Sequence, residues 1–181
     1  MKRLQSGSAT VETAFTLSIV VAAGMLFSDL FLLMRARVDL ERSTHMLAAT
    51  LANQAALTNN GVQQLLSGLA AQRGDTYQYY VAKVLPDRTL SWELPLGDAT
   101  GLCDSPVEGG SYQGVLPEAE DSQASDGRTA LLVVRACQAA GEVGLTQLQL
   151  DKNVLQIDAV ERMRTASVTL DETLAALAGV K

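Results

Sequence analysis

The chain has 181 residues, with 14 Lys and Arg against 20 Asp and Glu, which gives a net charge of −6. This acidic balance offers no electrostatic basis for nucleic-acid binding. Aromatic residues make up only 4% of the chain, so Ala and Leu must supply the core, which favours helices with a small sheet over a large β-sandwich. The length accommodates one membrane anchor and one domain of ordinary size.

An apolar stretch begins at Thr13 and ends at Met34. As a helix, these residues span roughly 33 Å, which matches a hydrocarbon core of about 30 Å. No proline interrupts the stretch, and in lipid a helix satisfies its own backbone groups. The sequence therefore predicts one transmembrane helix. The alternative is a secretory signal cleaved after the small residues 21–23, but Glu12 lies in its n-region and the apolar run continues well beyond that site.

Glu12 is the informative residue at the start of this span. A carboxylate there is costly unless it is paired or solvated, so it is a functional candidate. A simpler interpretation is that Glu12 caps the helix N-terminus, where the helix dipole favours an anion. The order of Lys2 and Arg3, then Gly7, then Glu12 five residues later, resembles a type IV prepilin signal. That resemblance implies that prepilin peptidase cuts between Gly7 and Ser8, and that Glu12 neutralises the new terminal amine of a neighbouring subunit.

Three stretches together resemble one family more closely. They are Ser-Ala-Thr-Val-Glu at 8–12, the apolar helix with Asp29 in its last third, and Leu-Leu-Met-Arg-Ala-Arg-Val-Asp-Leu-Glu-Arg-Ser at 32–43. They are similar to the TadE-like minor pilins (TadE and TadF) of the tight-adherence (Tad or Flp) pilus. A looser similarity returns near residues 155–164.

The resemblance implies a non-catalytic structural role in assembly, priming or capping of a Tad-type pilus. The implied partners are prepilin peptidase, other minor pilins, the major Flp pilin, the inner-membrane assembly platform and membrane lipid. The implied location is the inner membrane, single-pass, with the C-terminal part in the periplasm and with possible incorporation at the pilus tip or base. The positive-inside count alone is ambiguous, because basic residues flank the span on both sides.

The expected fold class is α+β, with a long N-terminal helix followed by a small antiparallel sheet and short helices. We expect a leader at 1–7, a transmembrane helix at 8–34, a stalk helix at 35–60 and a periplasmic domain at 61–181. The stalk keeps an apolar stripe at helical spacing through Leu40, Leu47 and Leu51. Asn-Asn-Gly at 59–61 is expected to end this helix near Leu57. His45 on the stalk is expected to be structural.

The expected elements of the domain follow in chain order. A short helix is predicted at 62–72, and a hairpin of strands at 76–85 and 89–94. Residues 95–125 are rich in Gly, Pro, Asp and Ser and are expected to form a long surface loop, with solvated acidic residues and no calcium site. A central strand is predicted at 129–137 and a last strand from 155 toward 164. A capping box at Thr169–Glu172 is expected to open a terminal helix.

The two cysteines, Cys103 and Cys137, lie beyond the membrane segment and 34 positions apart. With one histidine they cannot complete a zinc site, which needs three or four ligands. In an exported domain two cysteines more often form a disulfide, which would pin the early loop to the central strand; the alternative is two separate buried thiols.

No catalytic motif, Walker loop or dinucleotide fingerprint is present in the sequence. We therefore expect neither enzyme activity, nor a cofactor, nor a metal. A different class of function stays open, namely a signal-anchored periplasmic binding or adhesion module that uses the 95–125 loop and keeps residues 1–7.

Overall fold

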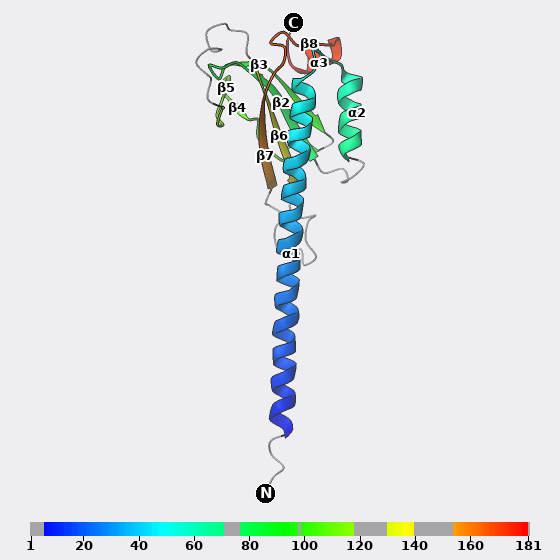
Figure 1. Cartoon of the computed structure of the whole chain (residues 1–181), viewed down its shortest axis with the longest axis vertical. Coiled ribbons are helices and arrows are strands. Elements are labelled where there is room, and N and C mark those ends of the chain that lie inside the picture. Colours follow the sequence, from blue (N-terminus) through cyan, green and yellow to red (C-terminus); the bar gives the residue numbers. More distant parts are fainter. Residues whose placement is uncertain (1–5, 71–76, 98, 118–129, 140–153, 181) are drawn as a thin grey trace.

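A long N-terminal helix projects from a domain built around a sheet (Figure 1). The computed structural model describes residues 6–70, 77–97, 99–117, 130–139 and 154–180. Helix α1 (Ser6–Ala52) has 47 residues without a break. Its lower part projects away from the domain and its upper part lies against the sheet (Figure 1). The expected α+β architecture, a long apolar helix followed by an antiparallel sheet, is confirmed.

The sheet has four antiparallel strands in the order β3-β2-β6-β7. They are β2 (Tyr77–Val84), β3 (Leu90–Gly97), β6 (Leu131–Ala139) and β7 (Val154–Arg162). All four predicted strands are therefore present, and the apolar run at 131–137 forms the most buried strand. It occupies a central place, between β2 and β7.

The upper part of α1 covers one face of this sheet. Leu40 and Ala48 are fully buried and Leu47 is 2% exposed, so the apolar stripe predicted for the stalk is the layer that closes the core. Ser43 and Thr44 are buried in the same layer. Both of their hydroxyls donate to the Leu40 carbonyl, at 2.8 and 2.7 Å, so they bring no unsatisfied polar group into the core.

Helix α1 ends at Ala52, five residues before the predicted end. The reason is long-range pairing with the C-terminal part of the chain. Arg164 N–H donates to the Ala52 carbonyl at 2.9 Å, and β1 (Ala56–Leu57) pairs in parallel with β8 (Thr169–Leu170). The Asn-Asn-Gly stretch does not terminate α1; it opens α2 (Asn59–Ala70), the second helix predicted at 62–72.

The terminal helix α3 (Glu172–Leu177) is capped by Asp171 and not by Thr169. The predicted capping box is wrong because Thr169 lies in β8. The Asp171 carboxylate accepts from Leu174 N–H at 2.8 Å and also from the backbone N–H of Asn59, the first residue of α2. One carboxylate thus joins the starts of two helices that are more than a hundred residues apart in sequence.

The expected surface loop is a folded layer over the other face of the sheet, as far as the structure describes it. Its first residues, up to Gly97, belong to β3. A small hairpin of β4 (Val107–Glu108) and β5 (Ser111–Tyr112) follows. Gly109 and Gly110 form its turn with φ of +59° and +80°, the conformation of a type I′ turn. Tyr112 is 1% exposed, in a second small core with Ala82, Val84 and Val133. Residues 118–125 lie outside the described part.

Candidate functional site: the membrane helix and the covered sheet face

The part of α1 before Leu40 exposes an almost continuous apolar surface. Among the described residues, one helical segment, Val11–Ala52, is long and apolar enough to cross a membrane. The rest of the chain buries none of the most apolar part of this segment. All three phenylalanines of the chain lie there, with exposed fractions of 70% for Phe15, 72% for Phe27 and 65% for Phe31. Such exposure is unfavourable in water. This part of the molecule is consistent with a single-pass membrane anchor.

Hydroxyl groups in this span find partners within the helix itself. Thr16 donates to the Glu12 and Thr13 carbonyls, both at 3.0 Å. Ser18 donates to the Ala14 carbonyl and Ser28 to the Gly24 carbonyl, each at 2.9 Å. Because these groups are satisfied without water, they add little to the cost of burial in lipid.

Glu12 has an exposed side chain at the lower end of this span. Helix α1 begins at Ser6 and has no acidic residue in its first turn. The effect of the helix dipole falls off within one turn, so Glu12, six residues into the helix, is not its capping residue.

Gly7 and Ser8, the predicted cleavage residues, lie in the first turn of the same helix as Glu12. Lys2 and Arg3 of the predicted leader lie outside the described residues. Asp29 is half-buried and lies roughly 26 Å further along the helix than Glu12 at 1.5 Å per residue.

His45 lies on the upper half of α1, with a side chain that is 51% exposed. Its Nδ1 is 3.8 Å from Glu161 Oε1 on β7. A solvent-exposed pair at that distance contributes little to stability, so the role of His45 stays a prediction.

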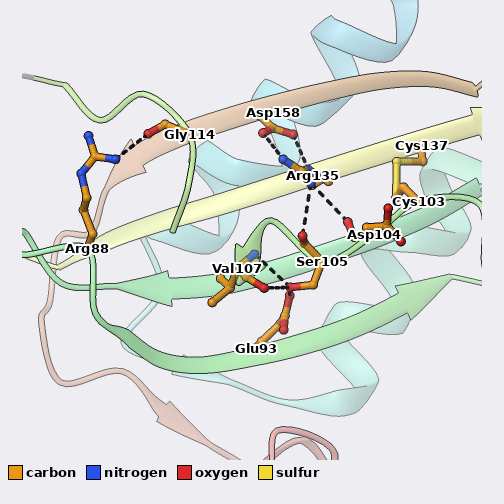
Figure 2. A network of polar contacts seen from close by, with 10 residues as sticks. All are labelled: Arg88, Glu93, Cys103, Asp104, Ser105, Val107, Gly114, Arg135, Cys137 and Asp158. Carbon is orange, nitrogen blue, oxygen red and sulfur yellow. Dashed lines mark hydrogen bonds and ion pairs between the residues drawn. A yellow bond between two sulfur atoms is a disulfide. The ribbon is translucent and has the colours of Figure 1, made fainter. Parts of the chain in front are cut away.

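The predicted disulfide is present. Cys103 and Cys137 are bonded with their Cα atoms 6.0 Å apart, so the alternative of two separate thiols is wrong. Cys137 is fully buried on the central strand β6. The bond attaches residues 99–117, called the covering loop below, to the face of the sheet turned away from α1 (Figure 2).

Two polar side chains of the sheet hold the same loop beside the disulfide. Gln78 Oε1 accepts from the backbone N–H groups of Leu102 and Cys103 at 2.7 and 3.2 Å. Figure 2 shows Arg135 between β7 and the loop. Its Nε and Nη2 donate to the two carboxylate oxygens of Asp158, each at 2.7 Å. Its Nη1 donates to the carbonyls of Asp104 and Ser105 at 3.2 and 3.3 Å.

Two titratable groups of this site, Arg135 and Tyr112, have shifted pKa values. The hydrogen bonds from Asp158 raise the pKa of the Arg135 guanidinium further above its ordinary value, against the opposing effect of partial burial. Burial, and then the nearby Asp158 carboxylate, raise the pKa of Tyr112. The Arg135 guanidinium therefore stays protonated, and the Tyr112 hydroxyl stays neutral, near pH 7.

Sequence reasoning missed Gln78, Arg135, Asp158 and Asp171. Two of them had a visible signal, because a lone Arg in Val-Val-Arg-Ala-Cys and a lone Asp in Gln-Ile-Asp-Ala-Val are charges placed inside apolar strands. In the described ranges, no group of three or more His, Cys, Asp and Glu side chains could hold a metal ion. Much of the acidic part of the predicted loop, including Asp98, falls outside those ranges.

Comparisons with protein-family models, with curated proteins and with solved structures find no match to this chain. Its function is therefore inferred from its own residues and their geometry.

Proposed function

We propose that this protein is a membrane-anchored minor pilin of the TadE-like type, which acts without catalysis in assembly, priming or capping of a Tad-type pilus in the inner membrane. One observation carries the proposal. A single carboxylate, Glu12, lies exposed at the lower end of a lipid-facing helix, five residues after Gly7, and a folded domain sits at the other end of the same helix.

Cleavage after Gly7 would make Ser8 the new terminus and place its amine one turn from Glu12. The first turn of α1 is suited to this step because its N–H groups have no partner within the helix and because glycine weakens a helix. The peptidase can therefore open this turn at small cost, without disturbing the span above it.

Assembly would then move α1 from lipid into a bundle of similar helices. The exposed apolar side chains of the span exchange contact with lipid for contact with neighbouring helices. Glu12 would have no water in such a bundle, so it needs a cation, and the terminal amine of a neighbouring subunit supplies one. Removing one partner of a buried pair costs about 3 to 5 kcal/mol, enough to prevent association.

Because α1 is continuous, the orientation of the apolar span determines the orientation of the domain. No linker separates the span from the domain, because α1 runs unbroken from the lipid-facing part to the buried residues Leu40 and Leu47. A contact that fixes the span in a bundle therefore fixes the orientation of the sheet and its covering loop, a property useful in a subunit that primes or caps a filament.

The test compares Glu12→Gln with Asp29→Asn in cells that make Tad pili. Glutamine keeps the size of Glu12 and removes only its charge. We expect Glu12→Gln to insert and to be cleaved almost normally, to lose crosslinks to the partner minor pilins and to abolish pili. Asp29→Asn should be milder, because Asp29 lies near the outer boundary of the span.

Assembly of pili by Glu12→Gln at wild-type level would contradict the charge-pairing mechanism. The competing function, a signal-anchored binding or adhesion module that uses the 95–125 loop, predicts that neither variant affects pili and that residues 1–7 are retained.

A further inference from the structure

The disulfide lies at the centre of a row of side chains that crosses three strands. Cys137 on β6 pairs with Gln78 on β2 and with Gln156 on β7. Directly paired residues in antiparallel strands have side chains on the same face, so the two glutamines flank the cysteine from either side. They differ in one respect: Gln78 is 4% exposed and contacts the loop, whereas Gln156 is exposed.

The peptide groups around Cys103 are held by the sheet independently of its sulfur. Gln78 Oε1 accepts the N–H groups of Leu102 and Cys103. The Gln78 amide is itself oriented by donating from Nε2 to Tyr80 Oη at 3.1 Å. This contact lies within strand β2, so the orientation of the Gln78 acceptor does not depend on the loop.

Arg135 holds the two following residues from the other side. It lies two positions before Cys137 on β6, so its side chain is on the same face. Its Nε and Nη2 atoms are held by the bidentate contact with the Asp158 carboxylate. Its Nη1 atom donates to the carbonyls of Asp104 and Ser105. A guanidinium with one edge already bound presents its last donor with little loss of entropy.

We propose that Gln78 and Arg135 form a non-covalent template that seats residues 102–105 on the sheet with Cys103 next to Cys137. The disulfide then locks a loop that is already in place. Two consequences follow: the template raises the effective concentration of one thiol toward the other, and the loop stays on the sheet when the disulfide is reduced. The proposal is independent of any role in a pilus.

The chemistry needs an external oxidant of the disulfide class, such as glutathione disulfide. One cysteine thiolate attacks the oxidant, forming a mixed disulfide and releasing one glutathione thiolate. The second cysteine thiolate attacks the protein sulfur of that mixed disulfide, forms the Cys103–Cys137 bond and releases the second glutathione. Two electrons pass from the protein dithiol to the oxidant, and the two thiol protons end on the two glutathione molecules.

The first measurement is the equilibrium of the full-length chain, in detergent, with mixtures of glutathione and glutathione disulfide. We expect Gln78→Met to lower the effective concentration of the thiols about tenfold, which corresponds to about 1.4 kcal/mol. Gln156→Met is the matched control, on the other side of the same cysteine, and should change it less than twofold. Equal values for the two glutamine variants would overturn the proposal.

The second measurement uses a chain with Cys103→Ser and Cys137→Ser, which cannot form the bond. Hydrogen exchange should show that the amides of residues 102 and 103 remain protected, and that adding Gln78→Met removes this protection. The Tyr112 amide, which donates to the Arg88 carbonyl at 3.0 Å, should stay protected in both. Exchange at 102 and 103 as fast as in an unfolded peptide, with Gln78 intact, would overturn the proposal even if Gln78→Met failed to fold.

Discussion

Replacing Leu47 with alanine, beside a matched Met46→Ala control, tests whether the upper half of α1 is a structural layer of the domain. The two residues are neighbours on the helix, roughly 20 Å beyond the end of the apolar span at 1.5 Å per residue. Their exposed fractions are 2% for Leu47 and 56% for Met46. Both substitutions introduce the best helix former, so a difference between them reports packing and not helix propensity.

The expected magnitude follows from this difference in burial. A buried leucine replaced by alanine loses its transfer free energy and leaves a cavity, a total of about 2 to 5 kcal/mol. An exposed substitution changes stability by about 0.5 kcal/mol or less. For a domain of this size the larger effect lowers Tm by on the order of 10 °C, whereas the Met46→Ala control should stay within about 2 °C.

The assay can use the single tryptophan of the chain. Trp92 is 5% exposed and belongs to the same core cluster as Leu47, so its fluorescence reports loss of that core while the span remains in a detergent micelle. If Leu47→Ala and Met46→Ala unfold at the same temperature, the helix does not cover the sheet, and the domain is stable without it.

Two further predictions concern polar contacts. Hydrogen bonds from the N–H of Leu174, and then from that of Asn59, lower the pKa of Asp171 below its ordinary value of 3.8. The ionised carboxylate therefore stabilises the folded state above pH 3.8, and this stability is lost as the pH falls through the folded pKa. Asp171→Asn should thus lower the stability at pH 7 and have a smaller effect at pH 2, as measured by Trp fluorescence. Arg135→Met leaves Asp158 without its partner and should cost about 1.5 to 3 kcal/mol. Adding Asp158→Asn should recover part of that loss, and strict additivity of the two changes in a double-mutant cycle would show that the pair does not interact.

The sequence predicts the elements whose signals are local. A mostly apolar stretch of 22 residues at 13–34, without proline, predicts the helix that is long and apolar enough to cross a membrane, and the apolar run that includes Val133 and Val134 predicts the central strand. The apolar stripe through Leu40, Leu47 and Leu51 correctly predicts which face of the stalk is buried. In each case the signal lies within the residues of the element itself.

The errors arise where distant residues decide the structure. The stalk was expected to continue to Leu57, but residues 56–57 pair with 169–170, and the Ala52 carbonyl accepts from Arg164. Thr169 matches a capping box, yet it is a strand residue and Asp171 is the cap. Such pairings have no local signature, because either partner alone fits a helix or a loop equally well.

The covering loop shows the same limit. Glycine, proline and acidic residues at 95–125 predict an irregular loop, but 95–97, 107–108 and 111–112 are strand residues. Composition also does not reveal that Tyr112 is buried against the sheet. Nor does it reveal that Gln78 and Arg135 bind the loop backbone, since main-chain partners leave no trace in sequence. The presence of two cysteines in a domain expected to be exported is the one sequence feature that indicated the attachment.

The mass of the mature N-terminus tests the proposed function most directly. Protein should be purified from cells that express a prepilin peptidase and make Tad pili, and its N-terminal peptide identified by mass spectrometry. The proposal predicts a chain that begins at Ser8, with Gly7→Leu blocking the cut and accumulating the longer form. Recovery of an intact Met1–Gly7 segment on protein from cells that assemble pili would contradict the proposal that this protein is processed as a pilin.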